Sequence, residues 1–384
     1  MLVLGLPRGG VAVAAEVAPE LGAPLDVLPV RDEEPAGCSR QLADGRVPPR
    51  LSPPPNAGGR LTDPASTRAV RAAVVERLGE PPVVREVPAP SAGPGRAVVR
   101  LLAAALNPVD LAIGAGRFYG PLPTPPYVAG AEAVGEVVEG ARIAPGTRVW
   151  CLGPGSGCFA ERFAAAEDHL VPVPDGVPDA LAAALGIAGL AGWMPVRHRG
   201  GLRPGETVLV LGASGSVGQI AIQAAVLGGA GRVVAAARSQ AGLARARALG
   251  AAATVTLGGG DDAAALRAAC APGADLLIDP LWGPPVLAAL GALAARARIV
   301  QVGGAAAPTV ALPAGPFRGG RLDLRGFSVF TEARGDLAAA YRELAEAAAA
   351  GAVRLDVEQV PLADAAAAWA RQGAGRDPKL VLVP

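Results

Sequence analysis

The chain has 384 residues, 51% of them hydrophobic, and its 35 basic and 34 acidic side chains leave a formal net charge of +1. A near-neutral chain with only 3% aromatic residues offers neither the basic surface nor the stacking platforms that nucleic acids or anionic membranes require. The length allows two domains, and the scattered cysteines indicate no disulfide framework, which fits a cytoplasmic protein.

The first 69 residues form an N-terminal extension. Residues 1–31 predict a strand over 2–6, a helix over 11–21 and a strand over 25–30, with the turn Pro-Arg-Gly-Gly after the first strand. This stretch resembles a fragment of a type I phosphoribosyltransferase. Two strands and one helix bury too little surface to fold alone, so we interpret it as a remnant or a misassigned start. The proline-rich residues 37–69 predict a linker.

The pattern then changes twice. Residues 71–175 are short β-branched segments with a turn signal about every ten residues, which predicts an antiparallel barrel or sandwich. From residue 179, helical and strand patterns alternate, which predicts a doubly wound parallel sheet and an α/β fold. Its helices are expected over 179–196, 216–229, 239–249, 261–271 and 284–295, and its strands over 206–212, 232–237, 252–256, 274–279 and 297–303. The tail predicts strands over 323–329, 353–360 and 380–383 and helices over 335–350 and 362–372.

A glycine turn is the most informative local feature. Gly212, Gly215 and Gly218 are spaced three residues apart, after a strand and before a helix. This spacing suits a tight turn, a close approach of the backbone to a pyrophosphate, and packing of the helix on the strand. The helix N-terminus then faces the anion. The remaining residues predicted to bind the cofactor here are Ala213, Ser214, Ser216 and Val217.

The end of the next strand indicates which dinucleotide binds. Arg238 lies twenty residues after Gly218, where enzymes that prefer NAD usually have an acidic residue. A guanidinium suits the 2′-phosphate of NADP, and the Ser239 hydroxyl is a further donor. An ordinary solvated arginine is the alternative. We therefore expect NADPH as the cofactor.

Ligands of open α/β sheets bind outside the carboxyl ends of the strands. Leu281 and Trp282 follow the fourth predicted strand, and Gly303 and Gly304 follow the fifth. We therefore expect Leu281 and Gly303 to contact the cofactor. The alternative is that the glycines only make turns.

Motifs in a fixed order carry a family resemblance. LNPVDLAIGAGRF (106–118), PPYVAGAEAVGEVVEG (125–140), GCFAERFAA (157–165) and LRPGETVLVLGASGSVGQIAIQAA (202–225) follow one another. Residues 70–384 thereby resemble the medium-chain dehydrogenase/reductase superfamily, in its zinc-free quinone oxidoreductase branch. The resemblance implies a GroES-like catalytic domain over 70–188, completed by about 340–384, and a Rossmann domain over 189–325.

The resemblance also predicts that no metal is bound. Zinc-dependent members have ligands at three places that hold Asn107, Ala131 and Ile187 here. None of these side chains is a thiolate, an imidazole or a carboxylate. Cys151 and Cys158 are interpreted as small core residues rather than ligands.

Without a Lewis acid, we expect hydride transfer from NADPH to a quinone or an α,β-unsaturated carbonyl compound. Asn107 is a candidate donor to a carbonyl or a cofactor amide, or else a turn residue before Pro108. Tyr119 is a candidate hydrogen-bond or proton donor, or else a core or lip residue. Asp110 is expected to anchor the local helix. By the resemblance Lys379, the only lysine, lies near the cofactor, although Asp377 and Pro378 precede it instead of glycine.

Two alternatives stay open: an enoyl-thioester reductase, and a non-catalytic protein that binds NADP as a sensor or scaffold. An enoyl-thioester reductase would need a basic entrance for its carrier, and the β-rich part shows no obvious arginine cluster. The resemblance leaves the oligomeric state open, with a homodimer as the usual arrangement.

Overall fold

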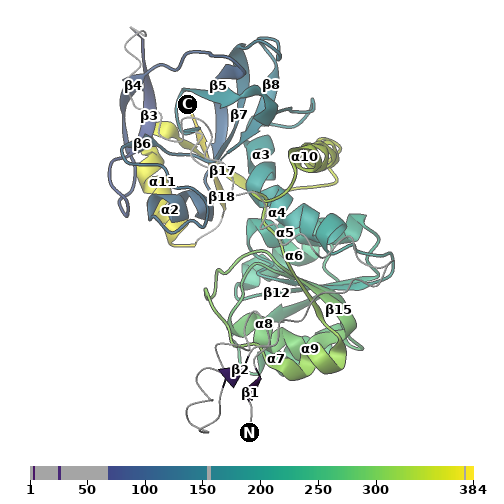
Figure 1. The fold of residues 1–384 in the computed structure, drawn as a ribbon. Coiled ribbons are helices and arrows are strands. Elements are labelled where there is room, and N and C mark those ends of the chain that lie inside the picture. Colours follow the sequence, from purple (N-terminus) through teal and green to yellow (C-terminus); the bar gives the residue numbers. More distant parts are fainter. Residues whose placement is uncertain (1–2, 5–24, 27–67, 154–156, 376–377) are drawn as a thin grey trace, which may run out of the picture. The chain divides into compact units, whose positions relative to one another are not determined.

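The computed structural model of the chain describes residues 3–4, 25–26, 68–153, 157–375 and 378–384 (Figure 1). In the N-terminal extension, β1 (Val3–Leu4) and β2 (Leu25–Asp26) form a parallel two-stranded sheet. They fall within the strands predicted over 2–6 and 25–30. The predicted helix over 11–21 and nearly all of the predicted linker over 37–69 lie outside the described residues.

The β-rich part contains a seven-stranded and a three-stranded sheet. The larger has the order β10-β8-β7-β5-β18-β17 with β9 on β5, and the smaller has the order β4-β3-β6. The strands are β3 (Ala69–Val75), β4 (Val83–Pro88), β5 (Arg96–Ala105), β6 (Tyr127–Val128), β7 (Glu132–Glu139), β8 (Arg148–Leu152), β9 (Arg162–Ala166), β10 (Leu170–Pro172), β17 (Val357–Pro361) and β18 (Lys379–Val383). Because β18 pairs antiparallel with β5, the C-terminal tail completes this sheet.

Short helices fit into the β-rich part. They are α2 (Pro108–Gly114), η1 (Glu167–His169), η5 (Leu362–Asp364) and α11 (Ala365–Gly373). Trp369 of α11 packs closely on α2, because a Cβ on Gly114 would lie 2.6 Å from its ring. The end of β5, the N-cap of α2 and the first residues of β7 and β18 position the polar side chains of the candidate site.

The second part is a doubly wound sheet, as the alternation predicted. All its pairings are parallel, in the order β13-β12-β11-β14-β15-β16. The strands are β11 (Thr207–Leu211), β12 (Arg232–Ala237), β13 (Ala253–Thr256), β14 (Ala274–Asp279), β15 (Leu293–Gln301) and β16 (Asp323–Gly326), and the helices are α5 (Ser216–Leu227), α6 (Gln240–Ala248), α7 (Asp262–Cys270), α8 (Pro284–Ala289), η4 (Leu290–Ala292) and α9 (Ala314–Gly320). Helix α10 (Arg334–Ala349) packs instead on the helix over 179–199.

The side chains of β11 alternate between two buried cores, which explains why helices cover both faces of the parallel sheet. Val208 and Val210 belong to the core that includes α5, whereas Leu209 and Leu211 belong to the core that includes α7 and α8. Successive side chains of a strand point to opposite faces, so a strand without polar residues is buried on both. Figure 1 shows α5 and α6 on one face of the sheet and α7, α8 and α9 on the other.

Some element predictions were wrong in their bounds, and one helix was missed. The helix predicted over 284–295 ends at Ala289, and β15 begins at Leu293 rather than 297. LAARAR has helix-forming composition, but pairing with β14 overrides it. The strand predicted over 353–360 begins at Val357. The prediction contained no counterpart of α9, whose sequence AGPFRGG holds three glycines and a proline.

A kinked helix joins the two parts of the chain. It runs over 179–199 as α3 (Asp179–Ala184), η2 (Leu185–Gly189), α4 (Leu190–Met194) and η3 (Pro195–Arg199), with non-helical ψ of −107° at Gly186. Among the described residues it is the one helix long and apolar enough to span a membrane. Its most apolar window is 83% buried against the protein, as in the core helix of a globular domain.

A variant that begins at residue 70 should be as soluble, as thermally stable and as active as the full chain. The reason is that the variant keeps nearly all of β3, the first strand of the described β-rich part, and that the sequence of the extension predicts too few elements for a core of its own. Thermal melts and NADPH binding of both forms test this, and mild proteolysis should cut first within 37–69. A melting temperature several degrees lower, or lost NADPH binding, would mean that the extension is part of the folded protein.

Candidate functional site

The glycine turn adopts the geometry that its spacing predicts. Gly212 follows β11 with φ of +62°, and α5 begins at Ser216 with Gly215 as its N-cap. A Cβ on Gly218 would lie 2.4 Å from the Gly212 carbonyl oxygen and 2.6 Å from the Ala213 Cα. The first turn of α5 therefore packs directly on the turn, and only glycine fits at Gly218. The backbone around Gly215 stays open, with no atom nearer than 3.6 Å to its would-be Cβ.

A second helix N-terminus adjoins the turn. Ser239 is the N-cap of α6, and its hydroxyl oxygen accepts from the Gly242 N–H at 3.2 Å. A Cβ on Gly242 would lie 2.3 Å from the Cβ of Ser214, so the first turn of α6 packs against the glycine turn. Arg238, directly after β12, is exposed and has no hydrogen-bond or ion-pair partner among the described residues. A cation and two helix N-termini therefore gather at the carboxyl end of the sheet.

The residues that follow β14 and β15 lie against the same glycine turn. A Cβ on Gly212 would contact the Leu281 side chain at 3.1 Å, and one on Gly303 would lie 3.0 Å from the Pro280 carbonyl oxygen. Asp279 is 0% exposed, and its Oδ1 accepts from the N–H groups of Leu281 and Trp282, both at 2.9 Å. Its Oδ2 has no partner among the described residues.

These residues fit a nicotinamide dinucleotide. The backbone cradle would hold the pyrophosphate, and Arg238 with the Ser239 hydroxyl would face a ribose phosphate. Leu281 and Gly303 border the cradle through the contacts above. The buried acceptor Asp279 Oδ2 gives this edge of the sheet one polar atom that a hydroxyl or amide of a ligand would satisfy.

The second feature of the site is a chain of buried polar side chains in the β-rich part. Lys379 Nζ, at the start of β18, donates to the Leu106 carbonyl oxygen at 2.7 Å and to Asn107 Oδ1 at 2.5 Å. Asn107 Nδ2 donates to Glu132 Oε1 at 2.7 Å and to the Ala105 carbonyl oxygen at 3.0 Å. Both amide hydrogens of Asn107 are therefore engaged, so the predicted donation to a carbonyl would require one of these bonds to open.

Glu132 lies at the centre of these buried polar side chains, and the kinked helix over 179–199 contacts its carboxylate. Its Oε2 accepts from the Ile187 N–H at 2.6 Å and from Trp150 Nε1 at 3.1 Å. The kink at Gly186 frees the Ile187 N–H from the helix ladder. A Cβ on Gly186 would lie 1.8 Å from Glu132 Oε2, so the carboxylate occupies the space of the missing side chain.

Burial shifts the pKa of the three charged groups in this buried cluster, Glu132, Lys379 and Asp110. Desolvation raises the pKa of Glu132, opposed mainly by the nearby Lys379 charge. Desolvation lowers the pKa of Lys379 to about 8, opposed by Glu132 and Asp110. It raises the pKa of Asp110 to about 7, although Asp110 Oδ2 and Oδ1 accept from the Asn107 and Ala131 N–H groups at 2.8 and 2.9 Å. The bond to the Asn107 N–H anchors the start of α2, as expected for Asp110.

The three residues at the positions of the zinc ligands in zinc-dependent members, Asn107, Ala131 and Ile187, lie close together around Glu132. Asn107 and Ile187 donate to its carboxylate, and Ala131 is its neighbour in the chain. The residues present do not fit a catalytic zinc, because an ammonium, an amide and one carboxylate make up the donor set. Over the described ranges, no group of three or more histidine, cysteine, aspartate or glutamate side chains is placed to hold a metal ion. Cys151 and Cys158 are buried free thiols.

Tyr119 lies at the surface rather than with Asn107. It is 68% exposed, and its hydroxyl hydrogen-bonds the Ser328 hydroxyl, from the segment after β16. Phe118 lies next to it, with ring centroids 4.5 Å apart, and contacts Phe330 edge-on at 5.4 Å. This position fits the expected lip residue better than a buried donor.

The sequence analysis missed two residues of the candidate site. Glu132 begins β7 between alanines, and an isolated carboxylate in the apolar run YVAGAEAVG was the available signal. Gly186 carried no signal of its own, because its role follows from the position of Glu132.

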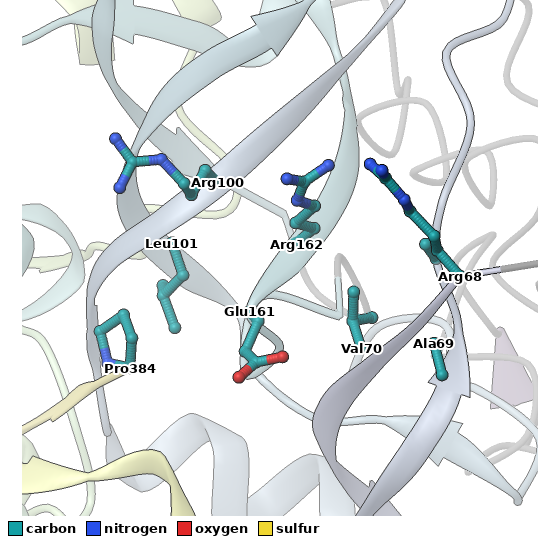
Figure 2. Close-up of a pocket in the computed structure, with 9 residues that line it drawn as sticks. Arg68, Ala69, Val70, Arg100, Leu101, Glu161, Arg162 and Pro384 are labelled. Atoms are coloured by element: carbon teal, nitrogen blue, oxygen red, sulfur yellow. The ribbon is translucent and has the colours of Figure 1, made fainter.

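A separate hollow lies on the β-rich part (Figure 2). It measures about 410 Å³ and is lined by Arg68, Ala69, Val70, Ala89, Arg100, Leu101, Glu161, Arg162 and Pro384. None of the predicted site residues lines it. Arg100 is paired with Glu136, and Glu161 with Arg71, so two of its charges are already compensated. Its position gives no reason to place the chemistry there.

Comparison with protein families covers both parts of the chain. Residues 93–175 match the alcohol dehydrogenase GroES-like domain, and residues 216–348 match the family described as zinc-binding dehydrogenase. A mouse quinone oxidoreductase is 33% identical over 177 residues, 43% of this chain and 53% of that protein. A Xenopus tropicalis mitochondrial enoyl-[acyl-carrier-protein] reductase is 34% identical over 169 residues, 42% of this chain and 48% of that protein. The chain thus matches about half the length of these relatives.

Solved structures match over more of the chain. A probable oxidoreductase from Mycobacterium abscessus has a TM-score of 0.73 and 30% identity, and the match covers 83% of this chain and 99% of that one. A mycobacterial protein solved in complex with NADPH has a TM-score of 0.74 and 25% identity, over 82% of this chain and 100% of that one. These matches extend the similarity across both the β-rich part and the parallel sheet.

Proposed function

The chain belongs to the medium-chain dehydrogenase/reductase superfamily, and we propose that it is a zinc-independent reductase that transfers hydride from NADPH to quinones or α,β-unsaturated carbonyl compounds. One observation carries the cofactor assignment. The exposed Arg238 follows β12 beside a glycine turn on which the first turns of α5 and α6 pack. A guanidinium placed there favours a cofactor with an additional phosphate.

In this proposal the chain's residues bind and orient, and the cofactor supplies the reactive group. When bound, the reduced nicotinamide supplies the hydride. The glycine turn from Gly212 to Gly218 holds the pyrophosphate, Arg238 and Ser239 hold the 2′-phosphate, and Leu281 and Gly303 contact the cofactor beside the turn. Asn107 contributes to the site through its hydrogen bonds with Lys379 and Glu132 rather than as an independent donor. Tyr119 borders the entrance for substrate, from its exposed position.

The choice of substrate rests on the chemistry of Asn107, Ala131 and Ile187, whose side chains offer no ligand for zinc at the three ligand places. A carbon that already accepts hydride, in a quinone or an enone, needs no metal to polarise its carbonyl group. We propose a cytoplasmic location and a small-molecule partner, with a homodimer as the expected assembly.

An enoyl-thioester reductase is the second candidate, favoured by the 34% identity to the mitochondrial enoyl-[acyl-carrier-protein] reductase. Both reactions add hydride to a carbon conjugated with a carbonyl group, so the two candidates share the site and differ in the group attached to the carbonyl. The third candidate, a non-catalytic NADP-binding sensor or scaffold, predicts cofactor binding without turnover.

A turnover screen separates the three. Purified full-length chain is mixed with NADPH or NADH and a panel of quinones, enones and enoyl thioesters, and cofactor consumption is followed. We expect consumption of NADPH with quinones or enones. Consumption only with thioesters supports the second candidate, and tight NADPH binding with no consumption supports the third.

Purified protein should contain no stoichiometric zinc and should keep its activity in a chelator. The reason is that Asn107, Ala131 and Ile187 stand at the three ligand places. Elemental analysis of the protein before and after dialysis against the chelator checks this. One zinc per chain, lost together with activity, would refute the assignment.

A further inference from the structure

Lys379 is the only lysine of the chain, and it is buried. Its side chain comes from the first residue of β18, and the residue is 6% exposed. Two of its three ammonium hydrogens are donated, to the Leu106 carbonyl oxygen and to Asn107 Oδ1. The third has no acceptor among the described residues. A buried ammonium with one uncommitted donor is costly, and a ligand oxygen would satisfy it.

Two buried carboxylates partly offset the cost of burying this cation. The charged groups that act on Lys379 are Glu132 on β7 and Asp110 on α2, and both are buried carboxylates. Asn107 lies between Lys379 and Glu132, with its carbonyl oxygen toward the ammonium and its amide toward the carboxylate. The amide orientation is therefore fixed from both ends. Glu132 is held in turn by the Ile187 N–H and Trp150.

We propose that the Lys379 ammonium provides the local positive charge that zinc provides in metal-dependent relatives, and that its third N–H donates a proton to the carbonyl oxygen of the substrate. The observation behind it is the direct bond from Lys379 to Asn107, the residue at the first ligand place. The proposal rests on the proposed reductase function and deepens it by assigning the proton donor.

The proton and electron balance is simple for an enone. Hydride adds to the β-carbon, the C=C electron pair shifts to form the enolate, and the enolate oxygen takes the proton from Nζ to give an enol. The enol then tautomerises to the saturated ketone, with the O–H proton lost to water and a proton from water gained at the α-carbon. Lys379 is left as a neutral amine, and a proton from water restores it. NADPH and one proton are consumed, and the saturated ketone and NADP⁺ leave.

A titration of Lys379 tests its state without any turnover. Selective ¹³C or ¹⁵N labelling of lysine in the full chain gives a single side-chain signal, because no other lysine is present. We expect a midpoint near pH 8 rather than the ordinary 10.5, since burial lowers the pKa. Glu132→Gln should lower the midpoint further, because it removes the carboxylate that raises the pKa. An ordinary midpoint, unmoved by that substitution, would overturn the proposal.

Kinetics then separate proton donation from a structural role. Lys379→Met should reduce kcat by at least ~100-fold with the NADPH dissociation constant unchanged, as loss of a general acid does. For the wild type, kcat should fall as pH rises through about 8, where the ammonium loses its proton. The stability of the wild type relative to Lys379→Met should instead rise between about pH 8 and pH 10.5, because the folded protein has released the Lys379 proton there and the unfolded chain still binds it.

The matched control is Arg342→Met, which removes an exposed cation of α10 bonded to the carbonyl oxygen of Ala338 in the same helix. It should leave kcat and its pH profile unchanged. An active wild type together with a Lys379→Met variant that is folded and equally active would overturn the proton-donor assignment alone. A wild type that consumes no NADPH with any substrate would overturn the proposed function and, with it, this inference.

Discussion

Replacing Glu132 by alanine should lower the free energy of unfolding by about 3–5 kcal/mol, the largest stability effect that we expect from a single substitution. Glu132 is 0% exposed and accepts three hydrogen bonds, from Asn107, Trp150 and the Ile187 backbone. Its loss leaves these donors without an acceptor and the buried Lys379 with less opposing charge. Buried donors without an acceptor, and a buried cation with less compensating charge, are costly for that reason.

Denaturant unfolding of wild type and variant measures the effect. The control is Glu136→Ala on the same strand, which removes an exposed ion pair with Arg100. That substitution should cost about 0–1 kcal/mol. Similar losses for the two variants would mean that Glu132 is not the centre of a buried network.

Replacing Arg238 by aspartate should reverse the cofactor preference, the largest functional effect that we expect at the cofactor edge. The wild type should bind NADPH more tightly than NADH, because the exposed guanidinium has no partner within the described part of the chain and can contact the 2′-phosphate. The variant should lose about 1.5–3 kcal/mol toward NADPH, roughly 10- to 150-fold in affinity. Its new carboxylate should accept from the ribose hydroxyls of NADH.

Calorimetric titration with each cofactor measures both affinities. The control is Arg247→Asp in α6, which changes the net charge equally but removes a side chain bonded to Thr254. The control should keep the preference for NADPH. Equal affinities of the wild type for the two cofactors would contradict the role of Arg238.

The fold was predictable because its signals are local and repeated. Strand β11, the glycine turn and α5 occupy 207–227 in the structure, close to the pattern that predicted them. Gly218 is an example, since the spacing of the three glycines alone predicts its place in the turn. The start of β15 was not predictable, because Leu293 and its neighbours favour a helix in isolation and become a strand only by pairing with β14.

The candidate site was predictable at the cofactor edge and much less so in the β-rich part. Asn107 and Lys379 lie 272 residues apart in sequence, and no local pattern indicates that β18 brings them into contact. The Glu132 carboxylate fills the space that a side chain at Gly186 would take. Neither residue indicates this contact when it is read in the sequence by itself. Tyr119 could not be assigned to the surface from its aromatic neighbourhood, because Ser328 comes from a distant segment.

Cofactor consumption with benzoquinone tests the central claim most directly. The full chain, pretreated with a chelator, is mixed with benzoquinone and either NADPH or NADH, and the initial rates are compared. The proposed function predicts steady consumption of NADPH, slower consumption of NADH, and no dependence on added zinc. Absence of consumption until zinc is supplied, or turnover that requires NADH, would contradict it.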